Sequence, residues 1–253
     1  MTAPPAYSVA QTFPAAPRGR FQFDRHYLLY ASSGSMRLDA EGTAWSLPPA
    51  RAALIRADEP IDVTITTTIA CRSVLFAPEI YPAPDAGVSV FDVSPLAREL
   101  ILECAQWGPE TDGQSGYATS LFQALANVAW QAASNPLRLS MPLARSDTVR
   151  RAIELTEAGL TEDLGFADLA RQLATSERSL ARHFSDELGM TWRQAQQRLR
   201  VIRAVEALAA SDRPVTDIAF SLGYNSMSAF NAAFRALTGK TPSEYRASFR
   251  PAE

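Results

Sequence analysis

Arginine is the residue type in this sequence that offers the most directional chemistry. Six arginines fall between Arg178 and Arg203 against two acidic residues, which leaves a local excess of four positive charges. Only one of the chain's 24 basic residues is a lysine. A guanidinium group forms paired, planar hydrogen bonds to guanine or phosphate, which an ammonium group cannot do. The stretch indicates a nucleic-acid contact, with a solvated helical face as the alternative for Arg193, Arg198 and Arg203.

Two amphipathic patterns of similar spacing could position such arginines. One spans about residues 166–190 and the other about residues 214–238, and in the second a glycine, Gly223, supplies a tight turn. Each pattern is a short apolar helix, a turn and a second helix, which predicts two helix-turn-helix units. The apolar stripes of the second helices are Leu180, Phe184 and Leu188 in the first unit, and Phe230, Phe234 and Leu237 in the second.

Capping boxes predict where two flanking helices begin. Thr191 with Gln194, and Thr241 with Glu244 behind Pro242, have the spacing at which a threonine oxygen and the third helical side chain bind exposed amides.

A set of residues with specific spacing recurs across both units and the turns that follow them. These positions are Leu180, Phe184, Glu187, Leu188, Gly189, Ile218, Ala219, Gly223, Tyr224, Ser226, Phe230, Phe234, Gly239, Pro242, Tyr245 and Arg246. On these residues, the region of about 147 to 250 resembles the DNA-binding region of the AraC/XylS family of bacterial transcriptional regulators. The resemblance implies that a long helix, from about Trp192 to Ala209, joins the two units and sets their separation.

The same resemblance implies which residues meet DNA. Arg182 is the leading candidate, because it faces away from the apolar stripe of its helix. Ala232 stands where the family's commoner pattern has an arginine, so the second unit is expected to read adenine through Asn231 and thymine through methyl contacts, or to bind mainly phosphate. The alternative is that Met227 and Ala232 shield the helix pair. The full set of expected DNA contacts is Arg178, Ala181, Arg182, Ser185, Arg193, Met227, Ser228, Asn231, Ala232 and Arg235.

The N-terminal half has the sequence pattern of a β protein. Short apolar segments from Phe21 to Phe76 are separated by turn residues, and Ile61, Val63 and Ile65 alternate with polar neighbours. This spacing predicts a small antiparallel barrel. With the family resemblance, the barrel is similar to the cupin-type jelly-roll sensor that many members carry.

Two helices are expected after the barrel, over residues 94–108 and 116–133. Their apolar stripes suit either a helix pair that covers the barrel or the seam of a homodimer. The stripes are Leu96, Leu100 and Cys104 in one helix, and Leu121, Leu125, Val128 and Ala132 in the other.

The helical pattern breaks between Asn135 and Pro142, and Ser146 caps the next helix. We therefore expect an α+β protein of two domains: residues 1–145 form the cupin-like sensor or dimerisation domain with its flanking helices, and residues 146–253 form an all-α tandem helix-turn-helix domain.

The sequence argues against metal or catalytic chemistry. A metal site needs clustered ligands, and the two histidines, His26 and His183, fall in different predicted domains. Cys71 and Cys104 give no disulfide framework and are expected to be structural thiols, with a redox pair as the alternative. No Ser-His-Asp, Cys-His or phosphate-loop pattern is present. We expect no metal, no cofactor and no enzymatic activity.

The predicted barrel is instead expected to hold a small molecule. Aromatic residues near its strands are the candidates for contacts with an apolar or aromatic effector, with ordinary core packing as the alternative for each. These residues are Phe21, Phe23, Tyr27, Tyr30 and Trp45.

Composition agrees with a regulator of two parts. The chain has 253 residues, of which 47% are hydrophobic, and a net charge of −3, so any basic surface must be local. No apolar run approaches the roughly 20 residues of a membrane span, and the N-terminal residues lack a secretory pattern. A cytoplasmic protein is expected, with no membrane partner.

Together these patterns predict a sequence-specific regulator that binds double-stranded promoter DNA, responds to an effector in the barrel, forms a homodimer and contacts RNA polymerase. The alternative is an effector-independent DNA-binding dimer whose barrel serves only protein contacts. Whether the regulator activates or represses depends on where its site lies relative to the promoter.

Overall fold

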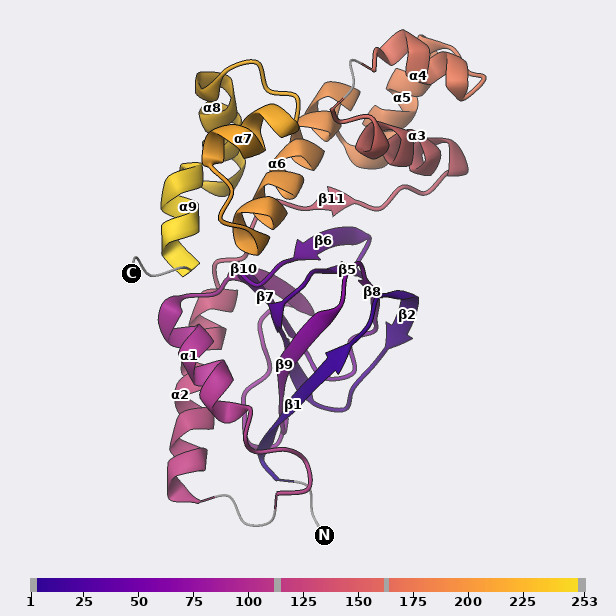
Figure 1. Cartoon of the computed structure of the whole chain (residues 1–253). Helices are drawn as coiled ribbons and strands as arrows, with labels where there is room; N and C mark the ends of the chain where they lie inside the picture. The colour runs from indigo at the N-terminus through magenta and orange to yellow at the C-terminus, as the bar shows by residue number, and fades with distance from the viewer. Residues whose placement is uncertain (1–3, 112–114, 162–163, 250–253) are drawn as a thin grey trace. The chain divides into compact units, whose positions relative to one another are not determined.

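The computed structural model describes residues 4–111, 115–161 and 164–249 (Figure 1). The chain divides into two compact units. The N-terminal unit consists mainly of Met1–Glu41 and Trp45–Leu137, and the C-terminal unit mainly of Arg138–Tyr245. The two-domain α+β fold predicted from the sequence is confirmed.

The strands, most of which belong to the N-terminal unit, form two antiparallel sheets, as in a jelly roll (Figure 1). One has the order β1-β9-β3-β7-β10, with β4 also paired to β9; the other has the order β11-β6-β5-β8-β2. Among the described residues no strand pairing joins the two sheets into a closed barrel. The strands are β1 (Ala6–Phe13), β2 (Ala16–Phe21), β3 (His26–Leu29), β4 (Ala31–Ser33), β5 (Met36–Ala40), β6 (Thr43–Leu47), β7 (Arg51–Ile55), β8 (Ile61–Ile65), β9 (Ile69–Phe76), β10 (Val88–Asp92) and β11 (Met141–Pro142).

Strand alternation builds two separate cores on the first sheet. Successive side chains point to opposite faces, so Tyr27 and Leu29 enter the inner core between the sheets, while Leu28 and Tyr30 enter the outer core. The inner core also receives the predicted buried face of β8, of which Ile61 is 1% exposed.

Two helices cover the outer core: α1 (Pro95–Cys104), capped by Ser94, and α2 (Gly116–Ala133), capped by Ser115 (Figure 1). Of the predicted stripe of α1, Leu96 is 60% exposed and does not cover the sheet. The helix is rotated so that Ala97, Ile101 and Cys104 face the sheet.

In α2 the buried face runs through Ala118, Phe122, Leu125, Ala126 and Ala129. The predicted Leu121, Val128 and Ala132 are only partly buried at its edges. Ring packing explains why this face of α2 is the buried one, since Phe122 and Trp107 lie edge to face with ring centroids 6.1 Å apart.

The C-terminal unit is helical. Both capping boxes are confirmed: Thr191 and Gln194 form a complete box at the start of α6, and Glu244 accepts the Thr241 backbone N–H at 2.7 Å before α9. The helices are α3 (Asp147–Ala158), α4 (Phe166–Gln172), α5 (Glu177–Leu188), α6 (Trp192–Ala210), α7 (Val215–Ser221), α8 (Met227–Thr238) and α9 (Pro242–Phe249).

Candidate nucleic-acid interface and ligand cavity

The first helix-turn-helix unit is α4, a turn and α5. Leu169 on α4 and Leu180 and Phe184 on α5 are each 0% exposed, so the two helices pack through the predicted stripes. Ser176 caps α5 by accepting the Ser179 backbone N–H at 3.1 Å. The face of α5 away from this packing is exposed and carries four of the predicted contacts: Arg178, Ala181, Arg182 and Ser185.

The second unit is α7, a turn and α8. Ile218 on α7 and Phe230 and Phe234 on α8 are each 0% exposed, and Ser226 caps α8. The outward face of α8 is less charged than that of α5. Of the predicted contacts on it, Met227 is half-buried, and Ser228, Asn231, Ala232 and Arg235 are exposed.

The turn of the second unit requires a glycine. Gly223 has a φ of +77°, and a Cβ atom there would lie 2.8 Å from the carbonyl oxygen of Leu160. Arg200 donates to the same carbonyl and lies 5.8 Å from the ring centroid of Tyr224. This contact links α6 and the second turn to a residue that precedes the first unit.

Three of the six arginines in the predicted basic stretch bind other residues of the C-terminal unit. Arg198 donates to the carbonyl oxygens of Arg138 and Ser140, at 3.2 and 2.9 Å. Arg203 pairs with Glu157 and Glu206 at 2.7 and 2.9 Å. Arg198 is half-buried against these carbonyls, whereas Arg203 lies on an exposed helical face as part of a surface ion-pair cluster.

The remaining arginines of the stretch are available to a partner. In the part of the chain that the structure describes, the guanidinium groups of Arg178, Arg182 and Arg193 form no hydrogen bond or ion pair, and all three residues are exposed. Arg193 is the second residue of α6, where its charge faces the positive end of a 19-residue helix. A cation in that position is stabilised by a bound anion such as a phosphate.

A groove of about 550 Å³ connects these elements. Ala181 and Ser185 of α5 form one side, and the start of α6 with Arg193 forms the other. Two predicted contacts on the recognition helix therefore share one concave surface with the predicted contact on α6.

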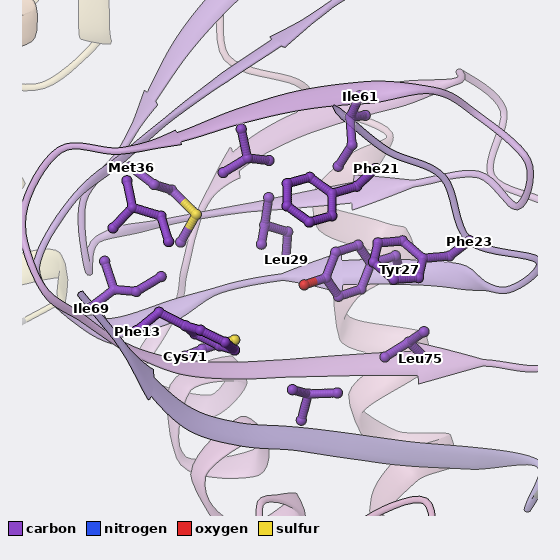
Figure 2. A pocket seen from close by; sticks show the side chains of 13 residues that line it. Phe13, Phe21, Phe23, Tyr27, Leu29, Met36, Ile61, Ile69, Cys71 and Leu75 are labelled. Carbon is purple, nitrogen blue, oxygen red and sulfur yellow. The ribbon is translucent and has the colours of Figure 1, made fainter. Parts of the chain in front are cut away.

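The N-terminal unit holds a cavity of about 320 Å³ between its sheets. Figure 2 shows its lining, with Phe21, Phe23 and Tyr27 grouped at one end. Phe21 and Phe23 are stacked with ring centroids 6.4 Å apart, and Phe23 lies 4.7 Å from Tyr27. Phe21 is 45% exposed, so this end meets solvent. The full lining is Val9, Phe13, Phe21, Phe23, Tyr27, Leu29, Met36, Ile61, Val63, Ile65, Ile69, Cys71 and Leu75.

Three of the five predicted effector contacts line this cavity, namely Phe21, Phe23 and Tyr27. Tyr30 does not, because strand alternation places it in the outer core beneath α1 and α2. Trp45 packs against the inner core but lies outside the cavity lining. The aliphatic residues of the lining were not among the predicted effector contacts, although the alternation of Ile61, Val63 and Ile65 marks the inward face of β8.

His26 has a structural role in β3. Its Nδ1 atom accepts the backbone N–H of Ala57 at 3.0 Å, and burial lowers its pKa. Within the described ranges no group of three or more His, Cys, Asp or Glu residues is arranged to hold a metal ion. Among those residues no helix has the length and apolar character of a membrane span.

Residues 169–248 match a family described as a helix-turn-helix domain. The transcriptional regulator NimR of Escherichia coli K12 is 29% identical over 224 residues, which cover 88% of this chain and 80% of NimR. The ornithine utilization regulator of Pseudomonas aeruginosa is 45% identical over 98 residues, or 39% of this chain. The matched part is 28% of that regulator's length.

Two solved structures are also similar to parts or all of the chain. The C-terminal domain of AraT from Geobacillus stearothermophilus is 29% identical, with a TM-score of 0.40, over 43% of this chain and 90% of that domain. ToxT from Vibrio cholerae is 13% identical, with a TM-score of 0.43, over 98% of this chain and 99% of ToxT. A further structure of ToxT contains an unsaturated fatty acid.

Proposed function

The chain belongs to the AraC/XylS family of helix-turn-helix transcriptional regulators, and we propose that it reads promoter DNA through α5 and α8 under the control of a small molecule. The molecule binds in the cavity between the two sheets. The protein acts in the cytoplasm by binding, without a catalytic step.

The distribution of arginine contacts carries the DNA part of the proposal. Arg198, Arg200 and Arg203 have partners within the C-terminal unit, whereas Arg178 and Arg182 project from the outward face of α5 with none among the described residues. Guanidinium groups on a helix that projects toward a major groove form paired hydrogen bonds with guanine.

Arg193 serves a different purpose in this proposal. Its place at the start of α6 suits a phosphate contact, which fixes the position of the unit on the duplex but carries no sequence information. In the second unit Asn231 pairs with adenine, and Ala232 and Met227 offer methyl contacts to thymine.

The spacing of the units agrees with two successive major-groove segments. The joining helix α6 has 19 residues, which corresponds to a length of about 28 Å. Successive major-groove segments on one side of a duplex lie roughly 34 Å apart. Helices placed at either end of α6 can therefore enter neighbouring segments.

We also propose that the protein forms a homodimer and contacts RNA polymerase. Two large apolar side chains on the helix pair support a protein contact there: Leu96 on α1 and Tyr117 on α2 are each 60% exposed. Sedimentation analysis of the Leu96→Glu variant tests the dimer, which should dissociate at concentrations where the wild type stays dimeric.

Selection from randomised duplexes with the full-length chain tests the central proposal. The bound pool should be enriched in sites with two preferred segments about one helical turn apart. A pool that shows no sequence preference, even at low salt, contradicts the assignment of α5 and α8 as reading helices.

A further inference from the structure

The cavity between the sheets combines an apolar wall with very few polar atoms. Of its 13 lining side chains, only those of Tyr27 and Cys71 carry a hydrogen-bond donor, Met36 adds a thioether sulfur, and none is charged. The lining comes from both sheets, so the chemistry of the cavity is set by the fold and not by one loop.

Both of these donor groups lie close to Ser73. The Cys71 sulfur lies 3.2 Å from the Ser73 hydroxyl oxygen, which also accepts the Tyr30 backbone N–H at 3.1 Å. The Tyr27 hydroxyl oxygen points into the cavity (Figure 2). A phenol oxygen has one donor and two acceptor positions, so Tyr27 can accept a hydrogen bond from a ligand.

This environment disfavours a charged ligand of either sign. An ion that enters an apolar cavity loses its hydration, and that cost is recovered only through an opposite charge or several hydrogen bonds. No lining residue supplies an opposite charge. Burial also raises the pKa of Tyr27, which keeps the phenol neutral and unable to balance a cation.

Size limits the ligand as well. An apolar cavity of about 150 Å³ takes up benzene, so one of 320 Å³ has room for a skeleton of about two such rings. The volume is at the lower end of the range typical of small-molecule sites.

We propose that the effector is an uncharged, largely apolar molecule of about two rings, or an alkyl chain of similar volume, with a neutral O–H or N–H group that donates to the Tyr27 oxygen. The inference rests on the effector part of the proposed function and names its ligand class. Carboxylic acids and amines that are ionised at neutral pH bind more weakly than this neutral ligand, because their charge is disfavoured between the sheets.

Three probes with one ring skeleton test the charge preference by calorimetric titration of the full-length chain. They are 2-naphthalenemethanol, which is neutral, 2-naphthoate, which is an anion, and 2-naphthylmethylamine, which is a cation at pH 7. The alcohol should bind at least ten-fold more tightly than either ion. Equal or tighter binding of an ion, or no binding of the alcohol, overturns the proposal.

Variants then locate the site. Ile65 lines the cavity and is half-buried, so Ile65→Trp should fill the cavity and abolish binding of the alcohol. The adjacent Thr64 points to the other face of β8, so Thr64→Trp is the matched control and should keep the affinity. Loss of binding in the control alone would place the probe outside the cavity.

Tyr27→Phe tests the hydrogen bond, because it removes the hydroxyl and keeps the ring. Affinity for 2-naphthalenemethanol should fall several-fold, and affinity for 2-methylnaphthalene should stay the same. A parallel fall for both compounds shows that Tyr27 contributes packing alone and overturns its role as the acceptor.

The readouts separate this inference from the proposed function, because the titrations contain no DNA. Failure of the alcohol to bind, in a chain that still selects a DNA site, refutes the ligand class alone. Binding of the alcohol in a chain that selects no DNA site refutes the proposed function and leaves the ligand class intact.

Discussion

The carboxylate of Glu187 holds the chain at Ser146. One carboxylate oxygen accepts the Ser146 hydroxyl at 2.6 Å, and the other accepts the Ser146 backbone N–H at 2.8 Å. Ser146 is the N-cap of α3, and Glu187 lies in the last turn of α5. The recognition helix is therefore tied to the residue at which the first helix of the C-terminal unit begins.

Replacement of Glu187 by Gln should destabilise the folded chain by roughly 1–3 kcal/mol, the usual range for lost hydrogen bonds to a charged group. The Glu187 side chain is 9% exposed, so solvent screens these bonds little. Urea denaturation at pH 7 measures the change. Glu154→Gln is the control, since its exposed pair with Arg151 should contribute less than about 1 kcal/mol. Equal effects of the two variants would contradict the role given to Glu187.

The same group should make stability depend on pH. Burial raises the pKa of Glu187, but hydrogen bonds from Ser146 and Arg145 outweigh it and hold the pKa below its ordinary value of about 4.5. The unfolded chain therefore takes up a proton first as the pH falls. The contribution of Glu187 is complete above pH 4.5 and is lost below it, down to the lowered pKa. Glu187→Gln should flatten this part of the stability curve.

Gly223 and Gly239 form a matched pair for testing the turn of the second unit. Both have a φ near +78°, so Ala at either position carries a similar backbone cost of about 1–2 kcal/mol. Only at Gly223 does the added Cβ meet the Leu160 carbonyl, at 2.8 Å, whereas at Gly239 it meets nothing within 4 Å. Gly223→Ala should therefore lower the thermal midpoint more than Gly239→Ala. A smaller or equal loss at Gly223 would show that the turn relaxes freely.

The helix-turn-helix units could be predicted because their signals are local. The stripe of Phe230 and Phe234 and the box of Thr191 and Gln194 depend on neighbours within a few residues, and sequence spacing records such contacts directly. The rotation of α1 could not be predicted, because Leu96 and Ala97 both continue an apolar stripe. Packing against the sheet decides between them.

The sequence also could not separate arginines that are free to meet a partner from arginines that are paired within the chain. Arg182 and Arg203 look alike in a basic stretch, but Glu157, which pairs with Arg203, lies in a different helix. Likewise Tyr27 and Tyr30 are both aromatic residues next to a strand. Their separation by three positions places them on opposite faces of the sheet, and that assignment requires the register of β3.

Arg193 should affect DNA binding through charge alone. The Arg193→Ala variant is expected to weaken binding to all duplexes by a similar factor and to lower the slope of log K against log salt by about 0.9, as for one lost phosphate contact. Titrations at several salt concentrations measure the slope. Arg203→Ala serves as the control, because Arg203 is paired with Glu157 and Glu206, and its slope should match the wild type. A change of base preference in Arg193→Ala would mean that Arg193 reads sequence.

Arg182 should instead affect sequence preference. Arg182→Ala is expected to cost roughly 1–3 kcal/mol on the best site and to relax the base preference in one of its two segments. Ala232→Ser should change affinity by less than about 0.5 kcal/mol, as for a surface substitution, because α8 has no guanidinium group at that position. Selection from randomised duplexes, scored position by position for the wild type and both variants, measures these effects. The exposed Arg151, which pairs with Glu154 on α3, supplies the control variant Arg151→Ala, which should select the wild-type site. Uniform weakening by Arg182→Ala across all sequences would make Arg182 a phosphate contact and contradict its role in base reading.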